Sequence, residues 1–336
     1  MSGKEILTPS VDRSRLVPPA IPSNAISRKH LFHLFETDLP GVTVVAAPAG
    51  FGKSSLVSQW AQSVERPTVW FSVNPEDSMQ TFFAHVLEAI RIVFPGFASD
   101  FENEPSPNAL NNIKKLTSAV AGIQGGFNFV LNNGAVDNPE VADFSQALID
   151  HLPDNVHLVI IRRATPTTSL ARYASLGNLS LITSQDLKFS PEEVSRIADL
   201  NAADIENQHS RSLLEKCDGW PAAVQMMTRA IARGHQSSNF EVESGSSPLA
   251  VLALETINSL NAENRSKISR LVLLSEFDLE TAAIVLGEDF SESYINKLAT
   301  DGLYVSVSSG PSRVYRFNDI VYEVLSRQEF GDPKEN

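Results

Sequence analysis

A lysine and two serines follow a short glycine-rich run near residue 50, and this combination suits phosphate chemistry. Gly50 and Gly52 let the backbone approach phosphate oxygens and direct N–H groups at them, and a helix start favours negative charge. Lys53 can reach β- and γ-phosphates, and the Ser54 hydroxyl can ligate Mg²⁺. The residues that we predict to bind a nucleotide here are Ala49, Gly50, Phe51, Gly52, Lys53, Ser54 and Ser55.

The residues on either side of this loop have the patterns of a strand and a helix. Residues 42–46 are apolar and β-branched, which is typical of a buried strand, and Leu56, Val57 and Trp60 recur at helical spacing. A strand, a glycine-rich loop and a helix in this order are the context that a phosphate loop requires. One position departs from the G-x-x-x-x-G-K-[ST] pattern, because Ala47 stands where its first glycine belongs.

Further strands and helices alternate along the chain and predict the fold class. Apolar runs at 67–73, 127–131, 156–163 and 179–184 are separated by helical segments, which indicates an α/β fold with a parallel, doubly wound sheet. Ser190 and Glu193 have the spacing of a capping box that starts a helical region. Residues 235–248 are rich in Ser and Gly and predict a linker. Beyond them, helical segments precede two alternating runs around a Gly-Pro turn, which predict a β-hairpin, or wing.

Composition restricts the classes of partner. The 336 residues carry a formal net charge of −13 and no long Lys/Arg run, which argues against direct nucleic-acid binding. A single cysteine, Cys217, excludes an intrachain disulfide and a cysteine-based zinc site. No apolar stretch approaches the ~20 residues of a membrane span, and the first residues lack the layout of a signal peptide. We therefore expect a cytoplasmic protein with no membrane contact.

The order of several motifs resembles a known family. The stretches are APAGFGKSSLVSQWA, VWFSVNPED, VIIRRATP with LARY, LKFSPEEV, DGWPAAVQMM and DGLYVSV…YRFNDIVYEVL. They are similar to STAND-class signal-transduction ATPases, in particular the MalT-like, or large LuxR-type, transcriptional regulators. This resemblance covers nearly the whole chain. It implies a P-loop NTPase parallel sheet (STAND/AAA+-like) at 1–188, a helical domain at 189–240 and a winged-helix domain at 241–330.

The resemblance also implies roles for individual residues. Arg28 matches an arginine on the adenine side of the nucleotide, Arg163 one that senses the γ-phosphate, and Pro221 a helical-domain proline that packs on the nucleotide. The implied ligand is ATP or ADP. Taken alone, Arg163 is also compatible with a surface arginine at a strand end, and Pro221 with the first residue of a helix.

Three residues in two segments depart from what the resemblance implies. The third strand ends in Asn132 and Asn133, where the family has two acids that help to hold magnesium and polarise the attacking water. An amide brings no negative charge and accepts no proton, so we expect weakened Mg²⁺ binding, with Ser54 as its protein ligand, and no general base. Asn318 stands where the family has a histidine that contacts the β-phosphate. No catalytic residue is predicted.

Four functions follow from these patterns. The first is a regulatory module that binds ATP or ADP and hydrolyses slowly or not at all. The second is an ATPase that uses Glu76, Asp77 or Asp137 as substitute acids. The third is a scaffold that binds no nucleotide, and the fourth is a DNA-binding wing, which the acidic composition disfavours. The family's repeat sensor and C-terminal DNA-binding domain have no counterpart in these residues. We therefore expect a fragment of a longer regulator or a short relative, with a protein partner.

Overall fold

The computed structural model describes residues 11–21, 25–74, 76–97, 109–132, 146–163, 170–206, 208–232, 260–274, 276–287, 305–307 and 314–317, and the single positions 254, 257, 291, 294, 295, 322 and 325. The chain divides into two compact units. The first contains residues 1–46, 53–162 and 166–182, and the second contains 47–52, 163–165 and 183–336. The loop 47–52 thus has its neighbours in the second unit, whereas the strand and helix that flank it belong to the first.

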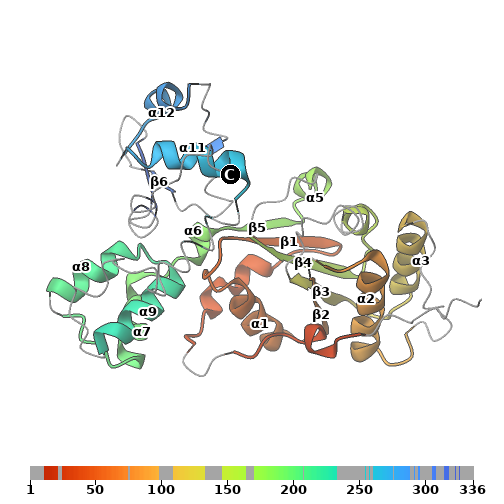
Figure 1. Cartoon of the computed structure of the whole chain (residues 1–336). Coiled ribbons are helices and arrows are strands. Elements are labelled where there is room, and N and C mark those ends of the chain that lie inside the picture. The colour runs from red at the N-terminus through yellow and green to blue at the C-terminus, as the bar shows by residue number, and fades with distance from the viewer. Residues whose placement is uncertain are drawn as a thin grey trace, which may run out of the picture. The chain divides into compact units, whose positions relative to one another are not determined.

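The described strands of the first unit form a five-stranded sheet in the order β2-β3-β4-β1-β5 (Figure 1). The strands are β1 Gly41–Ala46, β2 Thr68–Ser72, β3 Phe127–Asn132, β4 Val156–Arg162 and β5 Leu179–Ile182. Every neighbouring pair is parallel, so all carboxyl ends lie at one edge of the sheet, where open α/β sheets bind ligands. The predicted α/β fold and its strands are confirmed, with each boundary within two residues of the predicted range.

Helices cover both faces of this sheet (Figure 1). One face carries Val44, Phe129 and Leu158, which share an apolar core with α2 (Met79–Val93) and α3 (Ala109–Ala121). Helix α1 (Lys53–Ser63) covers the other face and buries Leu56, Val57 and Trp60. The Trp60 ring lies edge-on to the ring of His157, which points to that face from β4, 5.6 Å between centroids.

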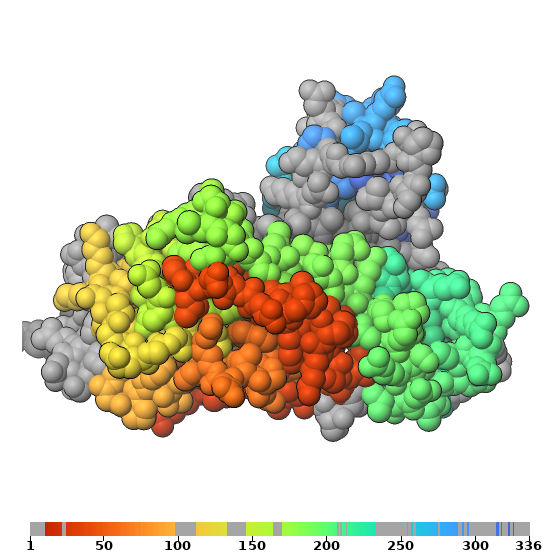
Figure 2. Space-filling view, turned by 180° about the vertical axis from the view of Figure 1, so that it is seen from behind, coloured from red at the N-terminus to blue at the C-terminus, as the bar shows by residue number. Residues whose placement is uncertain are grey.

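Two short 3-10 helices, η1 (Arg13–Leu16) and η2 (Lys29–Phe35), precede the sheet. Figure 2 shows the segment after residue 25, in red, lying beside the light-green segment that leads into β5. Helix α5 (Ala171–Ser175) lies in that second segment. The contact is held by Ser180 Oγ, which donates to the Leu34 carbonyl at 2.5 Å, and by Asn178 Nδ2, which donates to the Pro40 carbonyl at 3.1 Å. The N-terminal segment is therefore part of the first unit's structure.

The described part of the second unit is mainly helical. Its elements are α6 Ser184–Leu187, α7 Pro191–Leu200, α8 Gln208–Lys216, α9 Pro221–Ala232, α11 Ala262–Leu271, α12 Leu279–Leu286, β6 Val305–Val307 and β7 Tyr315–Phe317. The capping box predicted at the start of α7 is confirmed, because Ser190 Oγ accepts from the Glu193 N–H and the Glu193 carboxylate accepts from the Ser190 N–H. Asn201, which caps the end of α7, joins it to α9, because its Nδ2 donates to Thr228 Oγ1 at 2.8 Å.

Strands β6 and β7 pair antiparallel, which confirms the predicted hairpin. The winged-helix assignment and the predicted division at residues 188 and 240 remain predictions, and the linker at 235–248 lies outside the described residues. Among the helices that the structure describes, none combines the length and hydropathy needed to span a bilayer.

Candidate functional site

The phosphate loop has a backbone that only its glycines adopt easily. Gly50 and Gly52 have φ of 76° and 73°, in the left-handed region where a side chain costs about 1–2 kcal/mol. Ala47, at the position of the missing first glycine, is 1% exposed, so a methyl group is accommodated inside the fold at this point. The loop leads directly into α1 at Lys53. The strand–loop–helix predicted from the sequence is confirmed at these residues.

Residues at the start of α9 hold this loop through its carbonyl groups. The Trp220 indole Nε1–H donates to the Ala49 carbonyl at 3.2 Å, and the Ala222 N–H donates to the Gly50 carbonyl at 3.0 Å. The Phe51 ring, 1% exposed, stacks on Trp220 with centroids 6.2 Å apart. The loop is thus fastened to the helical unit on the side of its carbonyls.

A turn before α9 sets the direction of Trp220. Asp218 and Gly219 have φ of 45° and 71°, and a Cβ on Gly219 would lie 2.8 Å from the Phe189 carbonyl oxygen. Lys188 Nζ pairs with the Asp218 carboxylate at 3.2 Å. Cys217 beside this turn is fully buried, and burial raises the pKa of its thiol to about 12, so it stays protonated. The turn is a packed structural element.

Ser54, which follows the loop, contacts the end of β3, where Asn132 stands in place of an acid. Ser54 Oγ donates to Asn132 Oδ1 at 3.2 Å. Asn132 Nδ2 in turn donates to Ser72 Oγ at 3.1 Å, and that oxygen also accepts from the Trp70 indole N–H at 3.1 Å. These bonds fix the amide orientation, with its oxygen toward Ser54. Asn132 therefore places a neutral oxygen where the resemblance implies a carboxylate.

These two oxygens fit a magnesium ion only as a partner of bound phosphates. Adjacent ligands of an octahedral Mg²⁺ lie about 3 Å apart, because each bond is about 2.1 Å long, and Ser54 Oγ and Asn132 Oδ1 lie 3.2 Å apart. Both are neutral, so negative charge would have to come from phosphate. Across the described residues, no cluster of three or more His, Cys, Asp or Glu side chains is arranged to hold a metal ion.

One acid proposed as a substitute is already engaged. Asp77 is 3% exposed, and its two carboxylate oxygens accept from both terminal nitrogens of Arg15. Asp77 also accepts from the Asn74 N–H at 2.8 Å, and Arg15 Nε donates to the Ser72 carbonyl at 2.9 Å. This arrangement joins η1 to the end of β2. Glu76 is exposed beside it, and Asp137 lies outside the described residues.

Arg28 lies against α1. Its side chain is 6% exposed, its backbone N–H donates to Gln59 Oε1 at 3.0 Å, and Gln59 Nε2 donates to the Ile26 carbonyl at 2.9 Å. These two hydrogen bonds of the Gln59 side chain fix the backbone just before η2. Contact between Arg28 and adenine remains a prediction.

Sequence reasoning singled out Arg163 and overlooked its neighbour. Arg163 is exposed after β4, whereas Arg162 is its last residue and the register partner of Ala46, which ends β1 before the loop. Burial lowers the pKa of the Arg162 guanidinium, and its Nε has no hydrogen-bond partner among the described residues. The pair of arginines at 162–163 was the available signal, but the sequence does not tell which of them ends β4.

The remaining predicted residues divide between described and undescribed parts. Pro221 is buried as the first residue of α9, which agrees with its structural reading and leaves a nucleotide contact as a prediction. Ser55 lies in the first turn of α1. Asn133 and Asn318 lie outside the described residues. Trp220 was missed as a loop contact, because the GWP motif indicates a helix start and not the direction of an indole.

The chain is similar in sequence to known transcriptional regulators. No family model matches the chain. It is 25% identical over 329 residues to the HTH-type transcriptional regulator MalT of Vibrio cholerae, covering 94% of the chain and 36% of that protein. It is 23% identical over 299 residues to MalT of Klebsiella pneumoniae, covering 85% of the chain and 33% of that protein. The chain thus spans about a third of these relatives' length.

Among solved structures, a STAND protein with a tetratricopeptide repeat sensor from Pyrococcus horikoshii is similar with a TM-score of 0.48 and 16% identity, covering 92% of the chain and 43% of that protein. The similarity to MalT extends over nearly the whole chain and confirms the resemblance to MalT-like regulators that the order of the motifs predicts.

Proposed function

We propose that this MalT-like chain is a regulatory module that binds ATP or ADP at the loop of residues 47–52 and hydrolyses ATP slowly or not at all. The observation that carries the proposal is the contact between Ser54 Oγ and Asn132 Oδ1 at 3.2 Å. It places the serine hydroxyl that follows the phosphate loop against an uncharged amide. The parts needed for phosphate binding are therefore present, whereas the charge needed for hydrolysis is absent at this position.

In the proposed complex the loop supports the phosphates and Lys53 neutralises them. The two left-handed glycines turn backbone N–H groups toward the ligand, and the start of α1 adds its positive end. Ser54 would offer its hydroxyl to a phosphate-bound Mg²⁺, which supplies positive charge to the phosphate oxygens. Arg162 and Arg163 follow β4 at the same edge, and one of them would contact the terminal phosphate.

Slow hydrolysis follows from the groups around Asn132. An amide cannot take a proton from an attacking water. Asp77 is the buried acid after the neighbouring strand, and both its oxygens accept from Arg15, so it is committed to a structural ion pair. Using Asp77 as a base would break that pair. The substitute-acid ATPase therefore has little support among the described residues.

The contacts of Trp220 and Ala222 offer a route from the nucleotide to the helical unit. Phosphate binding depends on the loop backbone, and the carbonyl groups of the same backbone accept hydrogen bonds from Trp220 and Ala222 at the start of α9. If the loop moves when phosphate binds, its movement would be passed on to α9 through these two hydrogen bonds or would break them. Ligand-dependent switching of the kind expected for a signal-transduction ATPase would then begin at α9.

We further propose that the module acts with other segments or with a protein partner. Its relatives are HTH-type transcriptional regulators, and the chain spans about a third of their length. Transcription regulation would then also involve the parts of such regulators that lie outside the matched third.

Isothermal titration calorimetry with ATP and with ADP tests the proposal. Both should bind with one site, and Lys53→Ala should weaken binding about 100-fold or more, because the ammonium that neutralises the β- and γ-phosphates is lost. The matched control is Lys115→Ala, on the exposed surface of α3, which should leave affinity unchanged.

A phosphate-release assay with the same proteins separates the alternatives. The proposal expects release no faster than the Lys53→Ala background. Fast release that requires both Mg²⁺ and Lys53 would instead support the substitute-acid ATPase. Absence of binding by either nucleotide at about 1 mM would support the scaffold.

A further inference from the structure

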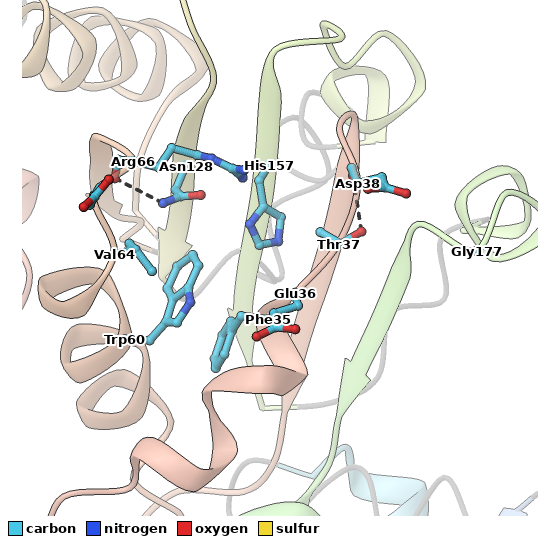
Figure 3. A pocket seen from close by; sticks show the side chains of 11 residues that line it. Phe35, Glu36, Thr37, Asp38, Trp60, Val64, Arg66, Asn128, His157 and Gly177 are labelled. Atoms are coloured by element: carbon cyan, nitrogen blue, oxygen red, sulfur yellow. Dashed lines mark hydrogen bonds between the residues drawn. The ribbon is translucent and has the colours of Figure 1, made fainter.

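A second cavity lies in the first unit, at the edge of the sheet opposite the phosphate loop (Figure 3). Its volume is about 680 Å³, within the range of small-molecule sites. Asn128 and His157 are the second residues of β3 and β4, whereas the loop follows the last residue of β1. The cavity is therefore distinct from the proposed nucleotide site.

The floor of this cavity combines aromatic rings with a neutral imidazole. The Phe35 and Trp60 rings stack with centroids 4.6 Å apart, and the Trp60 ring meets His157 edge-on. His157 is 1% exposed, and its Nε2 is hydrogen-bonded to Thr43 Oγ1 at 2.9 Å. Burial, with the nearby Arg66 charge as a smaller cause, lowers the pKa of His157 to about 4, so the floor is uncharged at neutral pH.

Beside His157 lies Asn128, whose side-chain oxygen can accept a further hydrogen bond. Asn128 is 1% exposed, and its Nδ2 donates to the Thr68 hydroxyl at 3.2 Å and to the Arg66 carbonyl at 3.4 Å. Its Oδ1 has no hydrogen-bond partner among the described residues, which costs about 1–3 kcal/mol unless a water or a ligand group donates to it.

Charged side chains of both signs surround this floor without neutralising one another. Figure 3 shows the Arg66 side chain extending toward His157 from one side, while Asp38 and Glu36 lie on the other. Glu65 adds a third carboxylate to the lining. Glu36, Asp38 and Glu65 are exposed and Arg66 is half-buried, and none of these four side chains has a hydrogen-bond or ion-pair partner within the described part of the chain.

We propose that this cavity binds a small zwitterion of the α-amino-acid class. The Arg66 guanidinium presents a planar fork that fits a carboxylate, and Asp38 and Glu36 present carboxylates to an ammonium. The stacked rings of Phe35 and Trp60 suit an apolar side chain. A simple anion would meet the repulsion of three carboxylates, and a simple cation would leave the Arg66 guanidinium without a counter-charge. A molecule that carries both charges satisfies both sides of the cavity.

The test measures binding of the free proteinogenic L-amino acids by thermal shift and then calorimetry, without nucleotide. We expect at least one to bind with a Kd below about 1 mM. Its C-terminal amide, which lacks the carboxylate, and its N-acetyl form, which lacks the ammonium, should each bind about tenfold more weakly or worse. Binding of none of the amino acids at about 10 mM would overturn the proposal.

Variants locate the binding in this cavity. Arg66→Gln should lower the affinity for the amino acid about tenfold. Arg196 is an exposed arginine on α7, and Arg196→Gln should change the affinity less than about twofold. Asp38→Asn, at an exposed position, should weaken binding of the free amino acid but not binding of its N-acetyl form. Affinity that survives both Arg66→Gln and Asp38→Asn would overturn the proposal. Because no nucleotide is present, this outcome is independent of the proposed nucleotide site.

Discussion

The two edges of the five-stranded sheet differ in how far their polar side chains bond to one another, although each edge holds a buried side-chain atom without a hydrogen-bond partner among the described residues, Arg162 Nε at one and Asn128 Oδ1 at the other. At the carboxyl edge, polar side chains bond to one another: Ser54 to Asn132, Asn132 to Ser72, and Arg15 to Asp77. At the amino edge, the side-chain oxygen Oδ1 of Asn128 has no hydrogen-bond partner among the described residues. The first edge surrounds the loop that we propose to bind phosphate. The second edge lines a cavity whose charged side chains are not paired with one another.

This difference separates binding from hydrolysis. A phosphate loop recognises its ligand mainly through backbone N–H groups, so it can persist when the acid beside it is replaced. The network around Asn132 uses an amide on both its oxygen and its nitrogen. An aspartate there would lose the donor to Ser72. The carboxyl edge is thus adapted to the asparagine.

The largest expected effect concerns the ion pair at the carboxyl edge. Arg15→Ala leaves the carboxylate of Asp77 buried without its cation, and we expect unfolding in urea to show a loss of about 3–5 kcal/mol. The matched control is Arg13→Ala on the same 3-10 helix. Arg13 pairs with Glu88 at 2.7 Å while 77% exposed, so its loss should cost about 0–1 kcal/mol. Equal losses for both variants would contradict a structural role of Asp77.

The glycines of the loop test how closely α9 holds it. Gly50→Ala combines a left-handed φ with a Cβ that would lie 2.8 Å from both Trp220 Nε1 and Ala222 Cβ, and we expect a loss of about 3 kcal/mol. Gly52→Ala has the same strain but no atom within 4 Å, so about 1–2 kcal/mol is expected. Similar losses in urea unfolding would show that Trp220 does not constrain the loop.

The amino edge should respond to acid. The pKa of His157 is about 4 in the folded protein and near its ordinary 6.5 in the unfolded chain, so the unfolded chain binds the proton first as pH falls. Stability should therefore decrease from pH 6.5 toward pH 4, by up to about 3 kcal/mol from this group.

The contribution of His157 is isolated by comparing the pH dependence of urea unfolding in the native protein and in His157→Asn. The substituted protein lacks the titrating imidazole, so its stability should fall less steeply with acid over this range. Parallel curves for the two proteins would contradict the assignment.

The sequence alone predicts the phosphate loop at the carboxyl edge of the sheet but not the cavity at its amino edge. The loop, its flanking strand and helix, and the position of Asn132 follow from local patterns, because consecutive residues build a phosphate loop. Trp220 and Arg162 were missed because their roles depend on the direction of an indole and on the register of β4 with β1. The cavity draws Phe35, Trp60, Asn128 and His157 from segments far apart in the chain. Only the sheet brings them together, so no spacing in the sequence indicates it.

The smallest expected effect is also the most direct test of the account. In the native protein, calorimetry should show ATP affinity that changes less than about threefold with Mg²⁺. Asn132→Asp adds a carboxylate beside Ser54 and should raise affinity with Mg²⁺ about tenfold. Gln62→Glu adds the same charge at an exposed position near the C-terminal end of α1 and should have no such effect. ATP affinity in the native protein that already depends strongly on Mg²⁺ would contradict the claim that this loop binds nucleotide beside an uncharged strand end.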